Sequence, residues 1–156
     1  MYTDSKYFVL DPSSMTVVQI DTPYKYLSGF FEYKGKLYAY GSTSNVDAKS
    51  LIMDLSDPYN PIDCSGALGF DSFNRFLINR AIVVGSDVIM VGQDSITDNN
   101  LIFASKNWKR NIKLLDEPRE DLYSNFRYCT YDGTNLVIAV DNSHSQMRVK
   151  KYQLNY

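Results

Sequence analysis

The sequence from 82 to 91 reads Ile82-Val83-Val84-Gly85-Ser86-Asp87-Val88-Ile89-Met90-Val91. It contains two short runs of β-branched and other apolar residues, separated by a Gly-Ser-Asp turn. Such runs are typical of β-strands, and glycine accepts the positive φ that a tight hairpin turn requires. The stretch therefore predicts a β-hairpin, and its first strand, which is apolar on both faces, is expected to be a buried innermost strand.

The same hairpin pattern occurs twice more, over residues 30–41 and 128–140. The three turn glycines are Gly35, Gly85 and Gly133, which are 50 and 48 residues apart. Each hairpin is followed by a polar loop and an expected third strand, and the first two units continue into a short fourth strand. The expected third strands cover 51–55, 101–105 and 147–152, and the fourth strands cover 62–64 and 112–114. The sequence thus predicts an all-β protein of about three four-stranded antiparallel repeats of about 50 residues, the last of which stops after its third strand.

We expect a single β-repeat domain over residues 1–156, with units at about 22–66, 67–116 and 117–156 and an N-terminal hairpin at 5–21. A repeated four-stranded unit of this length is typical of a β-propeller blade. Propellers have about four to eight blades, whereas this chain supplies about three. Three arrangements remain open: several chains pool their blades in one ring, the chain forms an open arc capped by a partner, or the repeats build another β-solid.

Composition excludes several classes of partner. The formal net charge is −2, which gives no electrostatic footprint for nucleic acid or an anionic membrane. No apolar run approaches the roughly 20 residues that span a bilayer, and the N-terminus has no signal-peptide pattern. Cys64 and Cys129 form no CxxC pair and are expected to be free thiols. These features predict synthesis in a cytoplasm.

The residues that carry catalysis or bind metals form no recognisable pattern. The one histidine, His144, lies in a Ser/Asn loop, and a structural zinc site would need four Cys or His ligands. The oxygen-rich loops 94–98 and 141–143 lack a calcium-binding spacing. Glu117 and Glu120 lie in a charged, proline-containing connection and are interpreted as solvated. We therefore expect no catalytic residue, no metal and no cofactor, and the chain is not expected to be an enzyme.

The turn Ala104-Ser105-Lys106-Asn107-Trp108-Lys109 resembles the Asp-box hairpin of sialidase-like propeller blades, with its Ser and Trp present and its Asp and Gly absent. Ser56-Asp57-Pro58-Tyr59 holds the same place in the first unit. The hairpin repeats as a whole are similar to propeller-like accessory modules of phage tails and tail-like particles. That resemblance implies a non-enzymatic structural or interaction module, whose partners are other subunits of an assembly or further copies of itself. It also implies a virion or tail-like particle as the protein's destination after synthesis.

A carbohydrate-binding lectin that closes a propeller by oligomerising is the alternative, with a glycan as its ligand. Aromatic side chains with polar groups suit both sugars and protein interfaces. Trp108 and Tyr59, on outer turns, are the expected binding residues. Tyr33, Tyr38 and Tyr40 follow strand alternation and are expected mainly to pack one sheet face on its neighbour.

Overall fold

The computed structural model describes residues 5–22, 24, 26–43, 49–69, 76–97, 99–108, 112–116, 125–141 and 147–153. Over these residues the all-β prediction is confirmed. Apart from one helical turn, α1 (Ser65–Leu68), and a 3-10 turn, η2 (Lys106–Trp108), every regular element described is a strand. No helix in this part of the chain is long and apolar enough to cross a membrane.

The strands form four separate antiparallel sheets, which we number I to IV in chain order. Sheet I contains β1 (Lys6–Asp11) and β2 (Thr16–Asp21). Sheet II has the order β3 (Tyr26–Tyr33), β4 (Lys36–Ser42), β5 (Ser50–Asp54) and β6 (Ile62–Asp63). Sheet III has the order β7 (Phe76–Val84), β8 (Asp87–Asp94), β9 (Asn100–Ser105) and β10 (Ile112–Asp116). Sheet IV has the order β11 (Asn125–Tyr131), β12 (Asn135–Asp141) and β13 (Met147–Gln153).

The hairpins form where the glycine turns predicted them. Gly35, Gly85 and Gly133 adopt φ values of 75°, 60° and 96°, a region that side chains with a Cβ disfavour. The N-terminal hairpin is also present, because β1 pairs with β2 from Lys6↔Asp21 to Asp11↔Thr16. The strand pattern that the sequence predicted is therefore correct within a few residues at each end.

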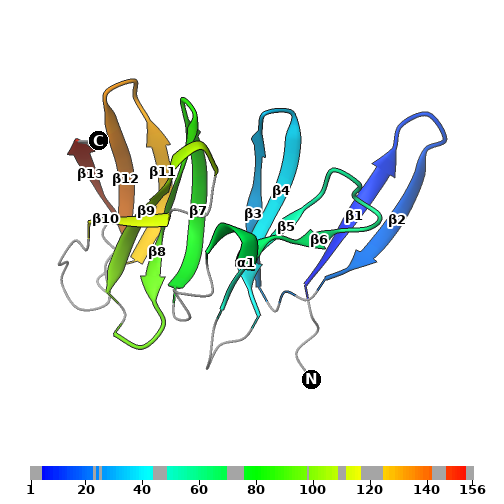
Figure 1. The fold of residues 1–156 in the computed structure, drawn as a ribbon, viewed down its shortest axis with the longest axis horizontal. Coiled ribbons are helices and arrows are strands. Elements are labelled where there is room, and N and C mark those ends of the chain that lie inside the picture. The colour runs from blue at the N-terminus through cyan, green and yellow to red at the C-terminus, as the bar shows by residue number, and fades with distance from the viewer. Residues whose placement is uncertain are drawn as a thin grey trace.

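The four sheets stand in an open row with their faces against one another, from sheet I at the right of Figure 1 to sheet IV at the left. Successive first strands are neighbours in space, since β3 contacts β7 and β7 contacts β11. Among the described strands, none of sheet IV pairs with sheet I, so no ring is closed by pairing between these strands.

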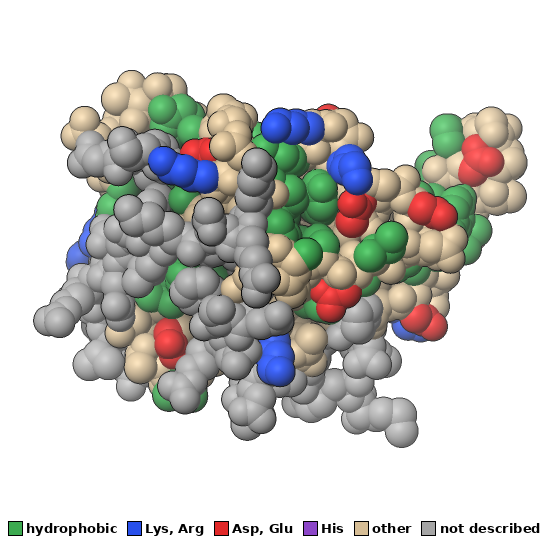
Figure 2. Space-filling model, in the orientation of Figure 1, with side chains coloured by type: hydrophobic (Ala, Val, Ile, Leu, Met, Phe, Trp, Pro, Cys, Tyr) green, Lys and Arg blue, Asp and Glu red, His purple; other side chains and the backbone are tan. Residues whose placement is uncertain are grey.

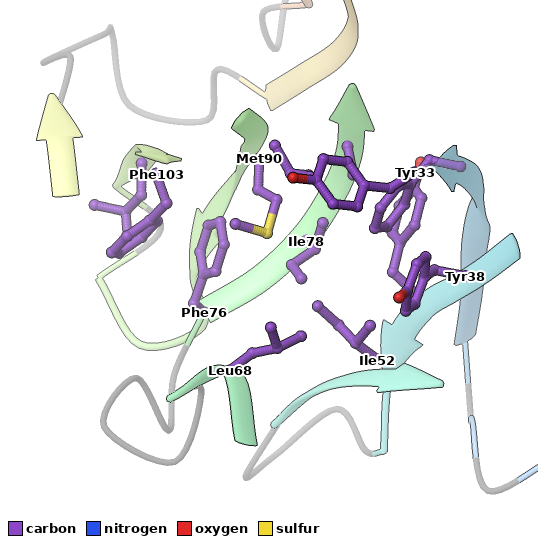
Figure 3. Close-up of a cluster of buried hydrophobic side chains, with 13 residues drawn as sticks. Tyr33, Tyr38, Ile52, Leu68, Phe76, Ile78, Met90 and Phe103 are labelled. Carbon is purple, nitrogen blue, oxygen red and sulfur yellow. The ribbon is translucent and has the colours of Figure 1, made fainter. Parts of the chain in front are cut away.

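The largest buried cluster fills the junction between sheets II and III (Figure 3). Tyr33, Tyr38 and Ile52 from sheet II face Ile78 and Met90 from sheet III. Leu68 of α1 closes the lower side of this cluster in the view of Figure 3, so the one-turn helix acts as a plug between two sheets.

Burial differs from the sequence-based expectation in one respect. The innermost strand was expected to be the most buried, but Val83 in β7 is 39% exposed. The most buried strands are the second and third of each complete sheet: β9 is buried throughout, Val88 to Val91 of β8 are at 0% exposure, and β4 and β5 are buried over Tyr38–Ser42 and Ser50–Met53. The reason is geometric, because the middle strands have a neighbouring strand on both sides and a neighbouring sheet on both faces.

Candidate interaction faces

Each sheet has two faces of different character, which we call forward, toward the next sheet in the chain, and backward, toward the preceding one. In sheet II, Tyr38, Tyr40 and Ile52 point forward into the junction with sheet III. Ala39 and Met53, one residue out of phase, point backward into the junction with sheet I. Strand alternation alone produces this division, because successive side chains leave a strand on opposite faces.

Strand pairing places equivalent forward residues in every hairpin. In each of sheets II, III and IV, the first strand has one irregularity in its pairing, and the residue just after it pairs with one residue of the second strand. These second-strand residues are Tyr40, Val91 and Ala139. Two positions earlier, Tyr38, Ile89 and Val137 share the same face. Ile89 and Val91 are buried against sheet IV. Val137 and Ala139 hold the same positions in the last sheet.

The irregularities are β-bulges at equivalent points of β3, β7 and β11, at Ser28, Asn79 and residue 127. Polar contacts between neighbouring first strands gather there. The Asn79 amide (Nδ2) donates to the Phe126 carbonyl at 3.1 Å. Arg80 donates from Nη1 to the Ser28 carbonyl at 3.2 Å, and its guanidinium lies 5.0 Å from the centre of the Tyr128 ring. Arg80 therefore links three sheets, which is a structural use of its charge.

The turn after the third strand reaches back to the preceding sheet in both complete units. In sheet II, the Pro58 carbonyl accepts a hydrogen bond of 2.6 Å from the Tyr7 hydroxyl of sheet I. In sheet III, the Trp108 ring meets Phe31 and Tyr38 of sheet II at centroid distances of 5.1 and 5.4 Å, edge to face in both cases. Each of these turns packs against the preceding sheet, and we call this contact a clasp. The two expected binding residues, Tyr59 and Trp108, lie in these turns.

Trp108 and Tyr59 thus occupy equivalent turns but different environments. Trp108 is half-buried, while Tyr59 is 48% exposed and its amide is bonded to Asp57 within its own turn. The two side chains belong to turns that clasp different junctions, and the structure does not bring them together in one site. Tyr33, Tyr38 and Tyr40 are buried, as expected for packing residues.

The chemistry of the described residues offers neither a metal centre nor an activated nucleophile. No group of three or more His, Cys, Asp or Glu within metal-binding reach occurs in the described part of the chain. Cys64 and Cys129 are free, and burial raises the pKa of each thiol to about 12, so neither is a thiolate near neutral pH. His144, Glu117 and Glu120 lie outside the described residues.

Asp94, in the first oxygen-rich loop, and Asp132, in the turn between β11 and β12, both stabilise backbone turns. Asp94 accepts the amides of Ile96 and Thr97 at 2.8 and 2.9 Å. Asp132 accepts two amides of its own turn, and these bonds lower its pKa to about 2. The carboxylates are therefore used to fix backbone turns.

Exposed apolar side chains occur along the whole row, and each end face carries a group of them. On sheet I, Phe8, Leu10 and Val17 point backward, away from sheet II, and are 64%, 55% and 60% exposed. Figure 2 shows hydrophobic side chains on this hairpin at the right of the view. On the forward side of sheet IV, Met147 and Val149 are 63% and 68% exposed. We call these surfaces the backward end face and the forward end face.

Comparisons with protein-family models, with curated proteins and with solved structures find no match to this chain.

Proposed function

We propose that this chain is a non-enzymatic interaction module, built of propeller-like blades and used as a structural component of a phage tail or tail-like assembly. The observation that carries the proposal is the pair of exposed apolar end faces, with Phe8 and Leu10 at one end and Met147 and Val149 at the other. Contiguous exposed apolar side chains on a soluble chain mark interaction surfaces.

The blade interpretation is supported by the order of strands within each sheet. Sheets II and III each run from a first strand that contacts its neighbours to a fourth strand at the opposite edge, with consecutive strands always adjacent. The first strands β3, β7 and β11 lie next to one another, as the innermost strands of neighbouring propeller blades do. An open row of such sheets is an arc, and an arc leaves one face uncovered at each end.

The carbohydrate-binding alternative has less support. Equivalent sugar sites in a repeat protein require similarly exposed aromatic rings at equivalent turns. Tyr59 is exposed, but the Trp108 ring contacts Phe31 and Tyr38 of the preceding sheet. The observation favours a clasp between blades at Trp108, and so it favours the interaction module.

The proposal is tested by sedimentation of lysates from the native host. We expect the endogenous protein to migrate with particles much larger than its own 17.9 kDa. A Phe8→Asp variant, which places a charge on the backward end face, should move to the free pool, whereas Ile96→Asp, in an exposed turn away from both end faces, should not. Migration of the wild-type protein as a free 17.9 kDa chain would refute the proposed function.

A further inference from the structure

We propose that the two end faces bind each other, so that copies of this chain stack head to tail. The inference rests on the proposed function and names the first partner, which is a second copy of the same chain. It also specifies the contact: the forward end face of sheet IV in one copy covers the backward end face of sheet I in the next.

The first argument is the pattern of the internal junctions. Equivalent forward positions are buried at successive junctions: Tyr38 and Tyr40 of sheet II against sheet III, and Ile89 and Val91 of sheet III against sheet IV. The forward residues of sheet IV, Val137 and Ala139, occupy the positions at which sheet III buries Ile89 and Val91. A sheet with an apolar backward face would therefore continue the row in the same sense, and sheet I of another copy provides one in Phe8, Leu10 and Val17.

The second argument is the charge on the two end faces. Strand pairing places Lys151 beside Val137 on the forward face, where its ammonium is ion-paired with Asp132 at 3.2 Å, and turns Arg148 and Lys150 to the backward side of β13. On sheet I, Lys6 is ion-paired with Asp21 at 3.3 Å. The charges of Lys151 and Lys6 are thus compensated within their own sheets, so the apolar residues of the two end faces can meet without bringing either lysine against an uncompensated like charge.

The third argument concerns edges and faces. Lysine-rich edge strands resist pairing with another strand, which is how natural sheets avoid growth at an open edge. β13 has this protection along its edge, while Met147 and Val149 are exposed on its forward face beside Lys151, which is ion-paired with Asp132. The strand is therefore built to be covered on its face, as sheets II and III are, and to remain unpaired at its edge.

Such a contact is heterologous: it uses two different surfaces, and both remain in use in every copy. Heterologous contacts give closed rings when the rotation per copy divides a full turn, and open filaments when it does not. Two copies would supply eight sheets, two of them two-stranded, which lies within the range of closed propellers of about four to eight blades. The inference fixes the direction of stacking and leaves the number of copies to the measurement.

The experiment uses two variants that each block one face. Phe8→Asp blocks the backward end face and Val149→Asp blocks the forward end face, and both side chains are more than half exposed, so the fold should tolerate them. Leu10→Asp and Met147→Asp block the same two faces if either first variant misfolds by circular dichroism. Ile96→Asp, in the turn held by Asp94, is the matched control for an added charge at an exposed apolar residue.

Mass is measured by light scattering on a sizing column at tens of micromolar protein. We expect the wild type and Ile96→Asp to form the same multimer of the 17.9 kDa chain, and each blocked variant alone to be a monomer. An equimolar mixture of the two blocked variants should give a species of twice the chain mass, because each variant keeps the face that the other has lost. This rescue distinguishes head-to-tail stacking from any symmetric contact.

Three results would overturn the inference: a monomeric wild type, an unchanged multimer in either blocked variant, or no dimer in the mixture. A monomeric wild type that still sediments with large particles in its host would refute self-stacking and leave the proposed function intact. A multimer that forms both in the purified protein and in the host lysate, but never enters a larger particle, would support self-stacking and refute the assembly role.

Discussion

Replacing Trp108 by alanine should remove the clasp between sheets II and III, that is, the packing of the Trp108 turn on sheet II, and destabilise the whole chain. The indole makes two edge-to-face contacts, at 5.1 Å with Phe31 and 5.4 Å with Tyr38. Such pairs contribute about 0.5–1.5 kcal/mol each beyond the area that they bury. Truncating a buried aromatic residue to alanine costs about 3–5 kcal/mol. Because Trp108 is only half-buried, we expect a loss near the lower end, about 3 kcal/mol.

The assay is urea unfolding followed by far-ultraviolet circular dichroism, since the variant lacks the one tryptophan of the chain. With a slope of about 2 kcal/mol per molar urea, a loss of about 3 kcal/mol lowers the midpoint by about 1.5 M. Tyr59→Ala is the matched control, because Tyr59 holds the equivalent turn but is 48% exposed, and its loss should stay below about 0.5 kcal/mol. Equal losses in the two variants, or less than about 1 kcal/mol for Trp108→Ala, would refute the clasp.

Three further predictions follow from particular residues. Gly92→Ala should destabilise the chain by about 1–3 kcal/mol in urea unfolding, because the added Cβ would overlap a backbone carbonyl of β7. Gly35→Ala should cost only about 1 kcal/mol, because Gly35 has open space around it and only its positive φ disfavours a side chain. A larger loss for Gly35→Ala than for Gly92→Ala would contradict the close approach at Gly92. Cys64 and Cys129 should resist a thiol reagent at pH 8 in the folded protein and react in urea, and fast labelling of the native chain would be inconsistent with their burial. Because burial raises the pKa of both thiols to about 12, the free energy of unfolding should also fall as pH rises from about 9 toward 12. The amides of its turn lower the pKa of Asp132 to about 2, so its contribution to stability is present above about pH 4 and is lost as pH falls toward 2. Asp132→Asn should therefore flatten the acid unfolding profile between about pH 4 and pH 2. An unchanged profile would exclude this turn as the source of that pH dependence.

The strands and their order could be predicted from the sequence because local signals specify them. Gly35 and Gly85 mark turns that need a positive φ, and the apolar runs on either side have the length of strands. The alternation Tyr38-Ala39-Tyr40 also separates two faces, and the structure buries these two tyrosines on one side and the alanine on the other. These features depend on neighbours in the chain, so a single sequence carries them.

The contacts between sheets could not be predicted in the same way. The bulge at Asn79 has no glycine or proline to announce it, yet it brings the Asn79 amide to the carbonyl of Phe126 in another sheet. Trp108 was assigned to an outer turn correctly, but the sequence does not say that the turn folds back onto Phe31, 77 residues earlier. Such contacts depend on how sheets stack, which no local pattern encodes.

The two ends of the row differ in polarity from the ends of most stacked-repeat proteins. Stacked-repeat proteins usually end in units whose outer face is polar, because an apolar terminal face would expose the surface that each internal unit buries. Sheet I departs from this rule, since Phe8 and Leu10 continue the apolar backward face to solvent. Sheet IV follows it in part, since its forward face carries the ion-paired Lys151, and departs from it with the exposed Met147 and Val149. Lysines on the edge strand β13 oppose strand addition, whereas the exposed Phe8, Leu10 and Val149 favour a partner that covers the faces of β1 and β13.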